Sequence, residues 1–521
     1  SFCDLRWGVD TSNEKDEEES SAKVLSVCMN EIDRSRPYML VLLGERYGFM
    51  PGEAAIGHEA VRKDMELEQL EISVTALEVE YGALSDPATL SNTWFYFREL
   101  SSEGTLPPEF LPESREHERK LSHLKERIHL LAGDRIRFYK AHWENGHVTG
   151  LEDFITQVEA DVTDQLRTEW ETYERLDPYE KDSLSQWNYM TEKCRSFSVF
   201  SDFAAGIIKR LEGSEPVTVV TGCSGSGKST LFAKVCLDLR TKGTRIFPFV
   251  CGNTSLTTDA FGILQSLVWQ LEDFLGEDHI EESPSEESFA EGGHTAAGAV
   301  PLSMSQWRNR LDELCLKAVS SGQILIAVDA LDQLQGGEIR DLLQFLPSVR
   351  PQGLHLFLTC LEDYALPGSL TPVSMPRMDE VQRHMVIKGI LAAIGKELTA
   401  PVTEALIRKN PDSTPLYLYL AVSRLTLMNA ADFQNIRNRG DGIEGITARQ
   451  LELVEDMPEG LEEMCAALVE AVGERINPSM CQRAVSYLAL SRLGLRLTDL
   501  ESLLETEQIT FQTLEFAQFV N

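Results

Sequence analysis

A glycine-rich loop constrains the fold of this chain more than any other feature of its sequence. Residues 222–229 read GCSGSGKS, which has the form GxxxxGKS. An apolar run at 217–221 predicts a strand before the loop, and a periodic apolar segment predicts a helix from the loop through Leu239. Glycines let backbone N–H groups approach phosphates, and the helix N-terminus adds positive potential. Strand, loop and helix therefore predict a phosphate-binding loop rather than a chance glycine-rich turn.

Within this loop, individual residues have distinct predicted roles. Lys228 is expected to reach the β- and γ-phosphates of a nucleoside triphosphate and to contribute to catalysis. The Ser229 hydroxyl is expected to bind Mg²⁺, with Thr230 as a less direct candidate. The predicted nucleotide-binding residues of this segment are Gly222, Cys223, Ser224, Gly225, Ser226, Gly227, Lys228, Ser229 and Thr230.

A second chemical motif lies about a hundred residues downstream, where 324–333 read ILIAVDALDQ. We expect Asp329, at the end of a buried strand, to hold Mg²⁺ through water and Asp332 to orient or deprotonate the attacking water. The alternative is an exposed loop that begins at Asp329, with Asp332 capping a helix. The glycine loop favours the first interpretation. A third strand at 354–359 ends in Thr359. Two roles remain equally open for Thr359, that of a γ-phosphate sensor and a purely structural one.

The pattern of apolar residues divides the chain into five segments. Alternating strand-like and helix-like pieces indicate α/β structure in 1–165, with strands at 37–44 and 93–97 and helices at 68–84 and 151–166. A polar helical linker is predicted for 166–212. The second α/β pattern covers 213–378, with further strands at 245–251 and 323–328 and a disordered acidic insertion at about 277–298. Helices alone are predicted after 379, in segments 379–440 and 441–521.

Charge and cysteine content limit the function classes. The net charge of −35 argues against broad nucleic-acid or anionic-membrane surfaces, since both require positive potential. The ten cysteines lie without the short spacings typical of zinc sites, which predicts reduced thiols in a cytoplasmic protein. No apolar run reaches the roughly 18 residues that span a bilayer. We therefore predict neither nucleic acid nor membrane as a partner.

Residues 195–521 resemble NACHT-type NTPases of the signal-transduction (STAND) class. The similarity lies in the glycine loop, VDALDQ (328–333), NPDSTPLYLYLAVSRL (410–425) and SRLGLRLTDLESLL (491–504). It is strongest to the group with nephrocystin-3, telomerase-associated protein and NACHT–WD-repeat proteins. It implies a three-layer αβα P-loop core at 213–378, a helical domain at 379–440 and a truncated winged-helix-like region at 441–521. It also implies that Pro415 abuts the adenine of ATP or ADP, although composition alone would make Pro415 a helix-start proline.

The segment 1–165 resembles the TIR-like (flavodoxin-like) domain of unknown function that often precedes NACHT modules. DLRWGV (4–9), LLGERYGFMP (42–51) and SVTALEVEYG (73–82) carry this similarity. The family's first strand and helix would precede Ser1, so we expect a truncated domain within a fragment of a larger protein. Some TIR-like enzymes cleave NAD with a helix-borne glutamate. Glu78 is the corresponding candidate here, near Arg46 in family terms, and a structural glutamate is the more frequent alternative.

Three functional hypotheses follow. The first is a switch with slow ATP hydrolysis, in which exchange of ADP for ATP controls self-association. The slow rate is expected because Gln333 stands where relatives often carry glutamate, and because a sensor arginine is missing after Thr359. The second is an NAD-consuming effector in 1–165, and the third is a scaffold in which nucleotide is structural. The resemblance also implies protein partners that bind C-terminal repeats beyond Asn521.

Overall fold

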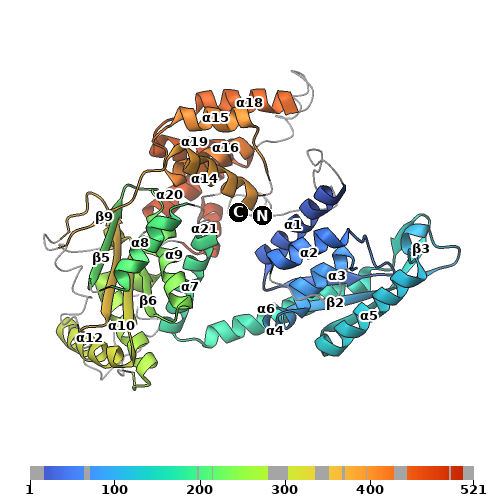
Figure 1. Ribbon diagram of the computed structural model, residues 1–521, viewed down its shortest axis with the longest axis horizontal. Coiled ribbons are helices and arrows are strands. Elements are labelled where there is room, and N and C mark those ends of the chain that lie inside the picture. Colours follow the sequence, from blue (N-terminus) through green and yellow to red (C-terminus); the bar gives the residue numbers. More distant parts are fainter. Residues whose placement is uncertain are drawn as a thin grey trace. The chain divides into compact units, whose positions relative to one another are not determined.

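The computed structural model describes residues 17–63, 71–195, 199–213, 215–279, 303–334, 351–366, 370–394, 396–427, 443–491 and 495–507. The chain divides into two compact units, Phe2–Arg175 and Leu176–Asn521 (Figure 1). The elements of the N-terminal unit are α1 Glu17–Ser35, β1 Met39–Leu43, α2 Glu53–Arg62, α3 Val74–Val79, α4 Pro87–Leu90, β2 Thr93–Ser102, α5 Arg115–Ala132, β3 Ile136–Glu144, β4 His147–Thr149 and α6 Glu152–Arg175.

The N-terminal unit is built on a four-stranded sheet in the order β1-β2-β3-β4. β1, β2 and β3 are parallel, with Leu43 opposite Phe97, and β4 pairs antiparallel with β3. Side chains from β1, β2 and the helices α1, α3 and α5 form its apolar core. The strands predicted at 37–44 and 93–97 are thus present, and the unit is mixed α/β.

Two elements of this unit differ from expectation. The helix predicted for 68–84 is helical only from Val74 in the described part, because the Ser73 side chain accepts a hydrogen bond from the Ala76 N–H (3.1 Å) and caps the helix there. It ends in a π-helical segment, Glu80–Leu84. The helix predicted for 151–166 continues to Arg175, since no helix-breaking residue follows before Pro178. Residues 64–70 lie outside the described ranges.

The C-terminal unit contains a second sheet and many helices. Its elements are α7 Pro178–Arg195, α8 Ser201–Leu211, β5 Val217–Gly222, α9 Lys228–Thr241, β6 Arg245–Val250, α10 Ala260–Leu275, α12 Met304–Ala318, β7 Ile324–Asp329, β8 Leu354–Leu361, β9 Val373–Ser374, α14 Glu380–Ala393, α15 Ala400–Lys409, α16 Pro415–Thr426, α18 Ile443–Asp456, α19 Leu461–Arg475, α20 Pro478–Leu490 and α21 Leu497–Thr506. Residues 280–302, most of the predicted insertion, lie outside the described ranges.

The second sheet is parallel and has the order β6-β7-β8-β5-β9. All six residues of β7 are buried, as expected for a strand covered on both faces. Val220, Leu325 and Phe357 pack with α8 and α9 on one face, whereas Val219, Ile326 and Leu358 pack with α10 and α12 on the other. The core is therefore three-layered, and its strands all present their carboxyl ends at one edge.

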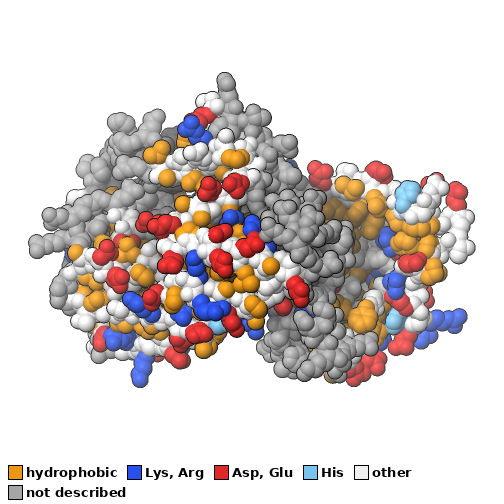
Figure 2. Space-filling model, turned by 90° about the horizontal axis from the view of Figure 1, so that it is seen from above, with side chains coloured by type: hydrophobic (Ala, Val, Ile, Leu, Met, Phe, Trp, Pro, Cys, Tyr) orange, Lys and Arg blue, Asp and Glu red, His pale blue; other side chains and the backbone are white. Residues whose placement is uncertain are grey.

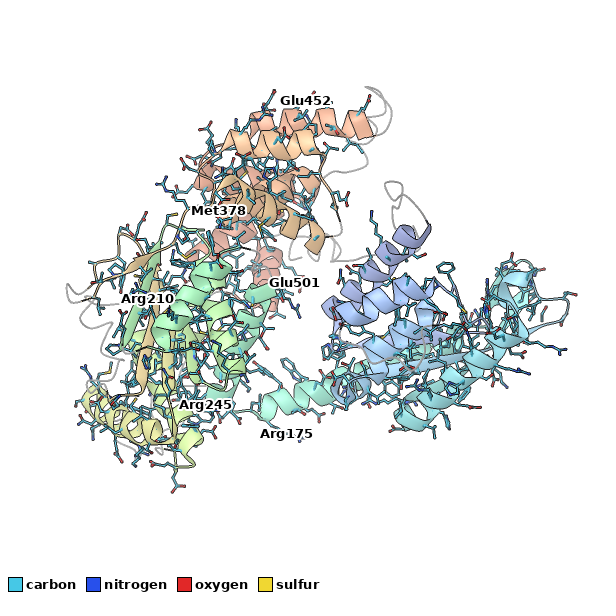
Figure 3. The ribbon with its side chains drawn as sticks, viewed as in Figure 1. Arg175, Arg210, Arg245, Met378, Glu452 and Glu501 are labelled. Atoms are coloured by element: carbon cyan, nitrogen blue, oxygen red, sulfur yellow. The ribbon has the colours of Figure 1, made fainter. Side chains whose placement is uncertain are left out.

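After β9, the regular elements among the described residues of this unit are helices. Met378, labelled in Figure 3, lies where the chain passes from the sheet into α14, and its buried side chain joins the core that includes residues of α8 and α9. Helices α14, α15, α16, α18 and α19 contribute to that same core, and α20 and α21 form a small cluster of their own. The ranges 443–491 and 495–507 contain helices only, so the predicted winged helix has no strand there. Residues 508–521 lie outside the described part, and the winged helix stays a prediction.

Candidate nucleotide-binding site

The glycine loop joins the carboxyl end of β5 to the N-terminus of α9. Gly225 and Gly227 have φ of +73° and +95°, a conformation that favours glycine. The Lys228 Nζ donates hydrogen bonds to the carbonyl oxygens of Gly222 (2.8 Å) and Cys223 (3.0 Å). The ammonium group thus lies over the loop, beside the N-terminal amides of α9 that have no partner within the helix. This arrangement provides the donors and the charge that a phosphate chain requires.

The start of α16 packs directly on this loop. The Leu416 N–H donates to the Gly225 carbonyl oxygen at 3.2 Å. A Cβ atom placed on Gly225 would lie 2.8 Å from the Leu416 Cβ, and one on Gly227 would lie 3.8 Å from the Pro415 Cγ. The Thr414 side chain caps α16 by accepting from the Tyr417 N–H. The structure therefore brings Pro415 to the glycine loop, while its contact with adenine stays a prediction.

Asp329 is the last residue of β7 and is buried, with 1% of its surface exposed. The Thr359 hydroxyl donates to its Oδ1 and accepts from the Ala330 N–H at 2.9 Å. Ala330 has φ of +57°, which is uncommon outside glycine and marks local strain beside the aspartate. Both hydrogen bonds of Thr359 are thus made within the protein. The structure places Thr359 as a positioning group for Asp329, and its role as a sensor stays a prediction.

The protonation of Asp329 reflects its surroundings. Burial raises its pKa, and the Asp332 carboxylate raises it further. The hydroxyls of Ser229 and Thr359 and the charge of Lys228 act in the opposite direction. The second oxygen, Oδ2, is buried and makes no hydrogen bond of standard geometry with any residue in the described ranges. A buried carboxylate in this situation is stabilised by a cation.

Neighbouring groups lie in the same buried environment, to which the carboxylates of Asp329 and Asp332 add negative potential. Burial raises the pKa of the Cys251 thiol well above its ordinary value, and the charges of Asp329 and Asp332 add to this. Burial raises the pKa of Tyr364 to about 12, with smaller contributions from Cys360, Cys251 and Asp332. A divalent cation would relieve this potential.

These residues fit Mg²⁺ bound together with a nucleotide. Mg²⁺ prefers oxygen ligands and is commonly held by one or two carboxylates plus phosphate oxygens. Ser229 and Asp329 supply such oxygens, and no cluster of three His, Cys, Asp or Glu side chains suited to a metal occurs among the described residues. We therefore assign any Mg²⁺ here to Ser229 and Asp329 together with phosphate, where it would neutralise phosphate charge.

Asp332 lies in the short turn Leu331–Gln333 that follows β7. Its Oδ1 accepts a hydrogen bond from the Leu361 N–H at 2.9 Å, at the end of β8. The Gln333 side chain is exposed, and its Oε1 lies beside Gly252, 3.2 Å from a Cβ placed there. The carboxyl ends of β5, β7 and β8 thus bring the loop, Asp329 and Asp332 together at one edge, the usual ligand position in open parallel sheets.

Sequence reasoning missed one side chain at this edge. Tyr189 comes from α7, in the segment predicted to be a linker, and is half-buried. Burial raises its pKa, and the negative charge of Asp329 raises it further, while the Ser229 hydroxyl lowers it. Tyr189 packs against the core that α7 shares with α9, the helix that begins at the glycine loop. No local motif marks it, since only the packing of α7 against α9 brings it there.

Glu78, the candidate residue of the N-terminal unit, lies on α3. Burial raises its pKa, and interaction with the Cys28 thiol of α1 partly offsets this. Arg46, its expected neighbour, instead forms an ion pair with Glu113 (2.8 Å). The Arg46 guanidinium is thus paired with Glu113, and the role of Glu78 and its proximity to Arg46 stay predictions. Trp7 and the rest of DLRWGV lie outside the described ranges.

The buried carboxylate leads to a first prediction, for Asp329→Asn. In metal-free protein at neutral pH this change is expected to raise the free energy of unfolding by about 1–3 kcal/mol, because it removes a charge whose burial is unfavourable. The sign follows from the raised pKa. The folded state binds the proton more tightly than the unfolded chain, so the metal-free protein loses stability as pH rises through that pKa. The same change should weaken Mg²⁺-dependent nucleotide binding about 10- to 100-fold.

Denaturant unfolding in EDTA and calorimetric titration with Mg²⁺-ADP measure these two effects. The matched control is Asp363→Asn, which removes an exposed carboxylate from the segment after β8 and should change neither quantity. If Asp329→Asn lowers metal-free stability and leaves Mg²⁺ dependence intact, Asp329 is a structural residue only.

The part of the chain that holds this site is similar in sequence to known proteins. The nephrocystin 3 N-terminal family matches residues 206–360, which include the glycine loop, Asp329, Asp332 and Thr359. Telomerase protein component 1 of Mus musculus is 24% identical over 541 residues, covering 96% of this chain. The match spans 19% of the length of that relative.

Solved structures similar to this chain include several ATPases. A Walker-type ATPase of Pyrococcus abyssi is 14% identical, with a TM-score of 0.31 over 62% of this chain and 88% of its own. The AAA domain of FIGL-1 is 12% identical, with a TM-score of 0.30 over 55% and 85%. AMPPCP-bound DnaA from Aquifex aeolicus is 14% identical, with a TM-score of 0.26 over 62% and 94%.

Two further properties concern the charge of the described surface and the hydropathy of the described helices. Figure 2 shows acidic and basic side chains interspersed over the described surface in that view, with no large field of basic residues. Within the described ranges, no helix is both long and apolar enough to cross a membrane.

Proposed function

We propose that this chain is a magnesium-dependent ATP/ADP switch of the NACHT-type STAND class, in which the bound nucleotide controls the position of the helical segment and thereby self-association. The proposal rests on one observation, the packing of the α16 N-terminus on the glycine loop. Leu416 donates to the Gly225 carbonyl oxygen, and Pro415 lies beside Gly227. A phosphate chain and α16 thus contact the same loop, so occupancy by ADP or ATP can favour different positions of α16.

The remaining site residues take the following roles in this proposal. Lys228 and the loop amides bind phosphates, Ser229 and Asp329 hold Mg²⁺, and Thr359 orients Asp329. Asp332 orients the attacking water. A switch requires different affinities for nucleotide in its two states rather than rapid turnover. Slow hydrolysis, a cytoplasmic location and protein partners at further repeats are parts of the same proposal.

Light scattering tests the switch directly. We expect the purified chain with Mg²⁺-ADP to have a lower mass than with Mg²⁺ and a non-hydrolysable ATP analogue, since only the second releases α16 from the loop. Hydrogen exchange of residues 414–427 should increase with the analogue relative to ADP. Equal molar mass and equal hydrogen exchange with both nucleotides at saturation would exclude the switch and favour a scaffold in which nucleotide is structural.

Slow hydrolysis leads to a second prediction, for Gln333→Glu. The exposed side chain at 333 lies beside Gly252, one residue after Asp332, so a carboxylate there could accept a proton from water. General-base catalysis typically contributes 10²–10⁴-fold, and we expect an increase of about 10- to 100-fold in steady-state ATP hydrolysis. Gln333→Ala is the control and should not accelerate the reaction. An unchanged rate in Gln333→Glu would show that the identity of this residue does not limit hydrolysis.

The NAD-consuming hypothesis remains a second candidate because of the environment of Glu78. Burial raises the pKa of Glu78, with the Cys28 thiol partly offsetting this, and a buried carboxyl group with a shifted pKa is typical of functional sites. Release of nicotinamide from NAD by the assembled protein, absent in Glu78→Gln, would support this activity. No release from the assembled protein would exclude it.

A further inference from the structure

A short segment at the end of α18 is bonded to the end of α15 and the start of α16. This segment, residues 455–460, comprises the last two residues of α18 and the loop before α19. Three side chains donate hydrogen bonds to its backbone carbonyl oxygens: Lys409 to Glu455 (2.8 Å), Asn410 to Glu459 (2.8 Å) and Tyr417 to Pro458 (2.6 Å). Because all three acceptors are main-chain atoms, these bonds fix the path of the segment itself.

Tyr417 is the buried member of this set. The residue is 1% exposed, whereas the hydrogen bonds of Lys409 and Asn410 lie at the surface. A hydrogen bond that water can replace contributes little to holding two elements together, but a buried hydroxyl that loses its partner is unfavourable. The Tyr417 hydroxyl is therefore the group that ties the 455–460 segment most firmly to α16.

The same residue lies next to the contact between α16 and the glycine loop. The Leu416 N–H donates to the Gly225 carbonyl oxygen (3.2 Å). The Tyr417 N–H donates to the Thr414 hydroxyl (3.3 Å), whose oxygen would lie 3.1 Å from a Cβ placed on Gly225. The backbone of Tyr417 is thus bonded to a residue on the loop, and its side chain to the Pro458 carbonyl. Moving the first turn of α16 off the loop therefore also draws the Tyr417 hydroxyl away from Pro458.

The 455–460 segment is continuous with the buried start of α19. Gly460 is the N-cap of α19, and its carbonyl oxygen accepts from the Met464 N–H at 3.0 Å. Met457 and Met464 are both buried in the core that contains Tyr417. Packed side chains of this kind transmit displacement to their neighbours. The segment and the first turn of α19 therefore respond together to loss of the bond from Tyr417.

We propose that Tyr417 is a positioning residue that couples the glycine loop to α19, through a bond to Pro458 that is made with ADP bound and lost when ATP releases α16. This inference rests on the proposed function and adds the path by which the switch acts beyond the nucleotide site. With ADP, the bond holds the 455–460 segment against α16. With ATP, the segment and the first turn of α19 are released together.

Hydrogen exchange of the full chain tests this coupling. Wild-type protein with Mg²⁺ and a non-hydrolysable ATP analogue should exchange faster than with Mg²⁺-ADP at two places, residues 414–427 and residues 456–467. Tyr417→Phe removes only the hydroxyl and keeps the ring in the core. In this variant 414–427 should still respond to the nucleotide, whereas 456–467 should exchange at the fast rate with both nucleotides. The matched control is Tyr419→Phe, which removes the hydroxyl of an exposed tyrosine of α16 and should behave as wild type.

The preference for ADP over the analogue provides a second measurement. Because the bond is made in only one of the two states, its loss should lower the ratio of the two affinities about three- to tenfold in Tyr417→Phe. Tyr419→Phe should keep the wild-type ratio. A merely structural bond, present in both states, would leave this ratio unchanged.

Two results would overturn the role of Tyr417 and leave the proposed function intact. One is wild-type protein in which 414–427 responds to the nucleotide and 456–467 does not, a result that requires no variant. The other is Tyr417→Phe that retains both the full nucleotide response at 456–467 and the wild-type affinity ratio. Absence of a nucleotide response at both places in wild-type protein would overturn the proposed function and this inference with it.

Discussion

Alanine in place of Lys228 is expected to weaken binding of Mg²⁺-ATP and Mg²⁺-ADP by roughly 30- to 5,000-fold. The Lys228 ammonium lies over the loop, with hydrogen bonds to the carbonyl oxygens of Gly222 and Cys223. Removing one partner of a close charge pair costs about 2–5 kcal/mol, and every 1.4 kcal/mol is a factor of ten in affinity. Because the loop conformation depends on Gly225 and Gly227 rather than on this side chain, the folded state should persist. Calorimetric titration measures the affinity.

A lysine at the far end of α9 provides the matched control. Lys242 directly follows α9 and pairs with Glu212 at 2.8 Å, far along the helix from the loop. Lys242→Ala removes an equal charge and should leave affinity unchanged, which separates the local contact from the net charge of the protein. If Lys228→Ala bound nucleotide as tightly as wild type, the loop would not be the phosphate site.

The second large effect is expected from Gly225→Ala, which tests the packing of α16 on the loop. A non-glycine residue in the left-handed region costs roughly 1–2 kcal/mol. The new Cβ would also lie 2.8 Å from the Leu416 Cβ, and overpacking of this kind costs about 1–3 kcal/mol. The free energy of unfolding should therefore fall by about 2–5 kcal/mol, with a loss of nucleotide affinity because the loop must move. Denaturant unfolding of the metal-free protein measures the first effect.

Gly243 offers a control that isolates the contact with α16. It has φ of +90° but open space where a Cβ would be placed. Gly243→Ala should therefore cost only the backbone term, about 1–2 kcal/mol. The difference between the two variants is the energy of the steric conflict with Leu416. If both variants lost the same stability, α16 would not pack on the loop in solution.

The nucleotide site could be predicted from the sequence where its chemistry is local. Residues 222–229 carry the phosphate loop in one continuous segment, and the buried run before Asp329 predicted a strand that ends at the sheet edge. The structure brings the loop and Asp329 to one carboxyl edge because β5 and β7 both pair in parallel with β8. Family resemblance implied that Pro415 abuts the adenine, whereas its position beside Gly227 comes from the structure alone.

Contacts between distant segments could not be predicted. The two hydrogen bonds of Thr359 depend on β8 lying next to β7, a pairing that no pattern in either strand specifies. Helix α7 is held against the sheet because Gln186 and Asp182 form hydrogen bonds with residues 64 and 84 positions away in the chain. Polar residues at helical spacing in a charged segment were therefore taken for a linker, although they anchor a helix.

Errors in the N-terminal unit have local physical causes. β3 was missed because polar residues interrupt it, unlike the continuous apolar run of β1. One of them, Arg137, forms an ion pair with the Asp161 carboxylate (2.9 Å). The start of α3 was placed too early because the run before it is also rich in helix-forming residues. The Ser73 cap, rather than propensity, decides where the helix begins.

Direct analysis of nucleotide in the purified protein tests the central claim most simply. The account predicts about one ADP or ATP per chain, released on denaturation and identified by chromatography, or, for protein purified empty, stoichiometric binding of Mg²⁺-ADP on titration. Lys228→Ala, purified in parallel, should contain none. Folded wild-type protein that neither retains nucleotide nor binds added Mg²⁺-ADP or Mg²⁺-ATP would contradict the account.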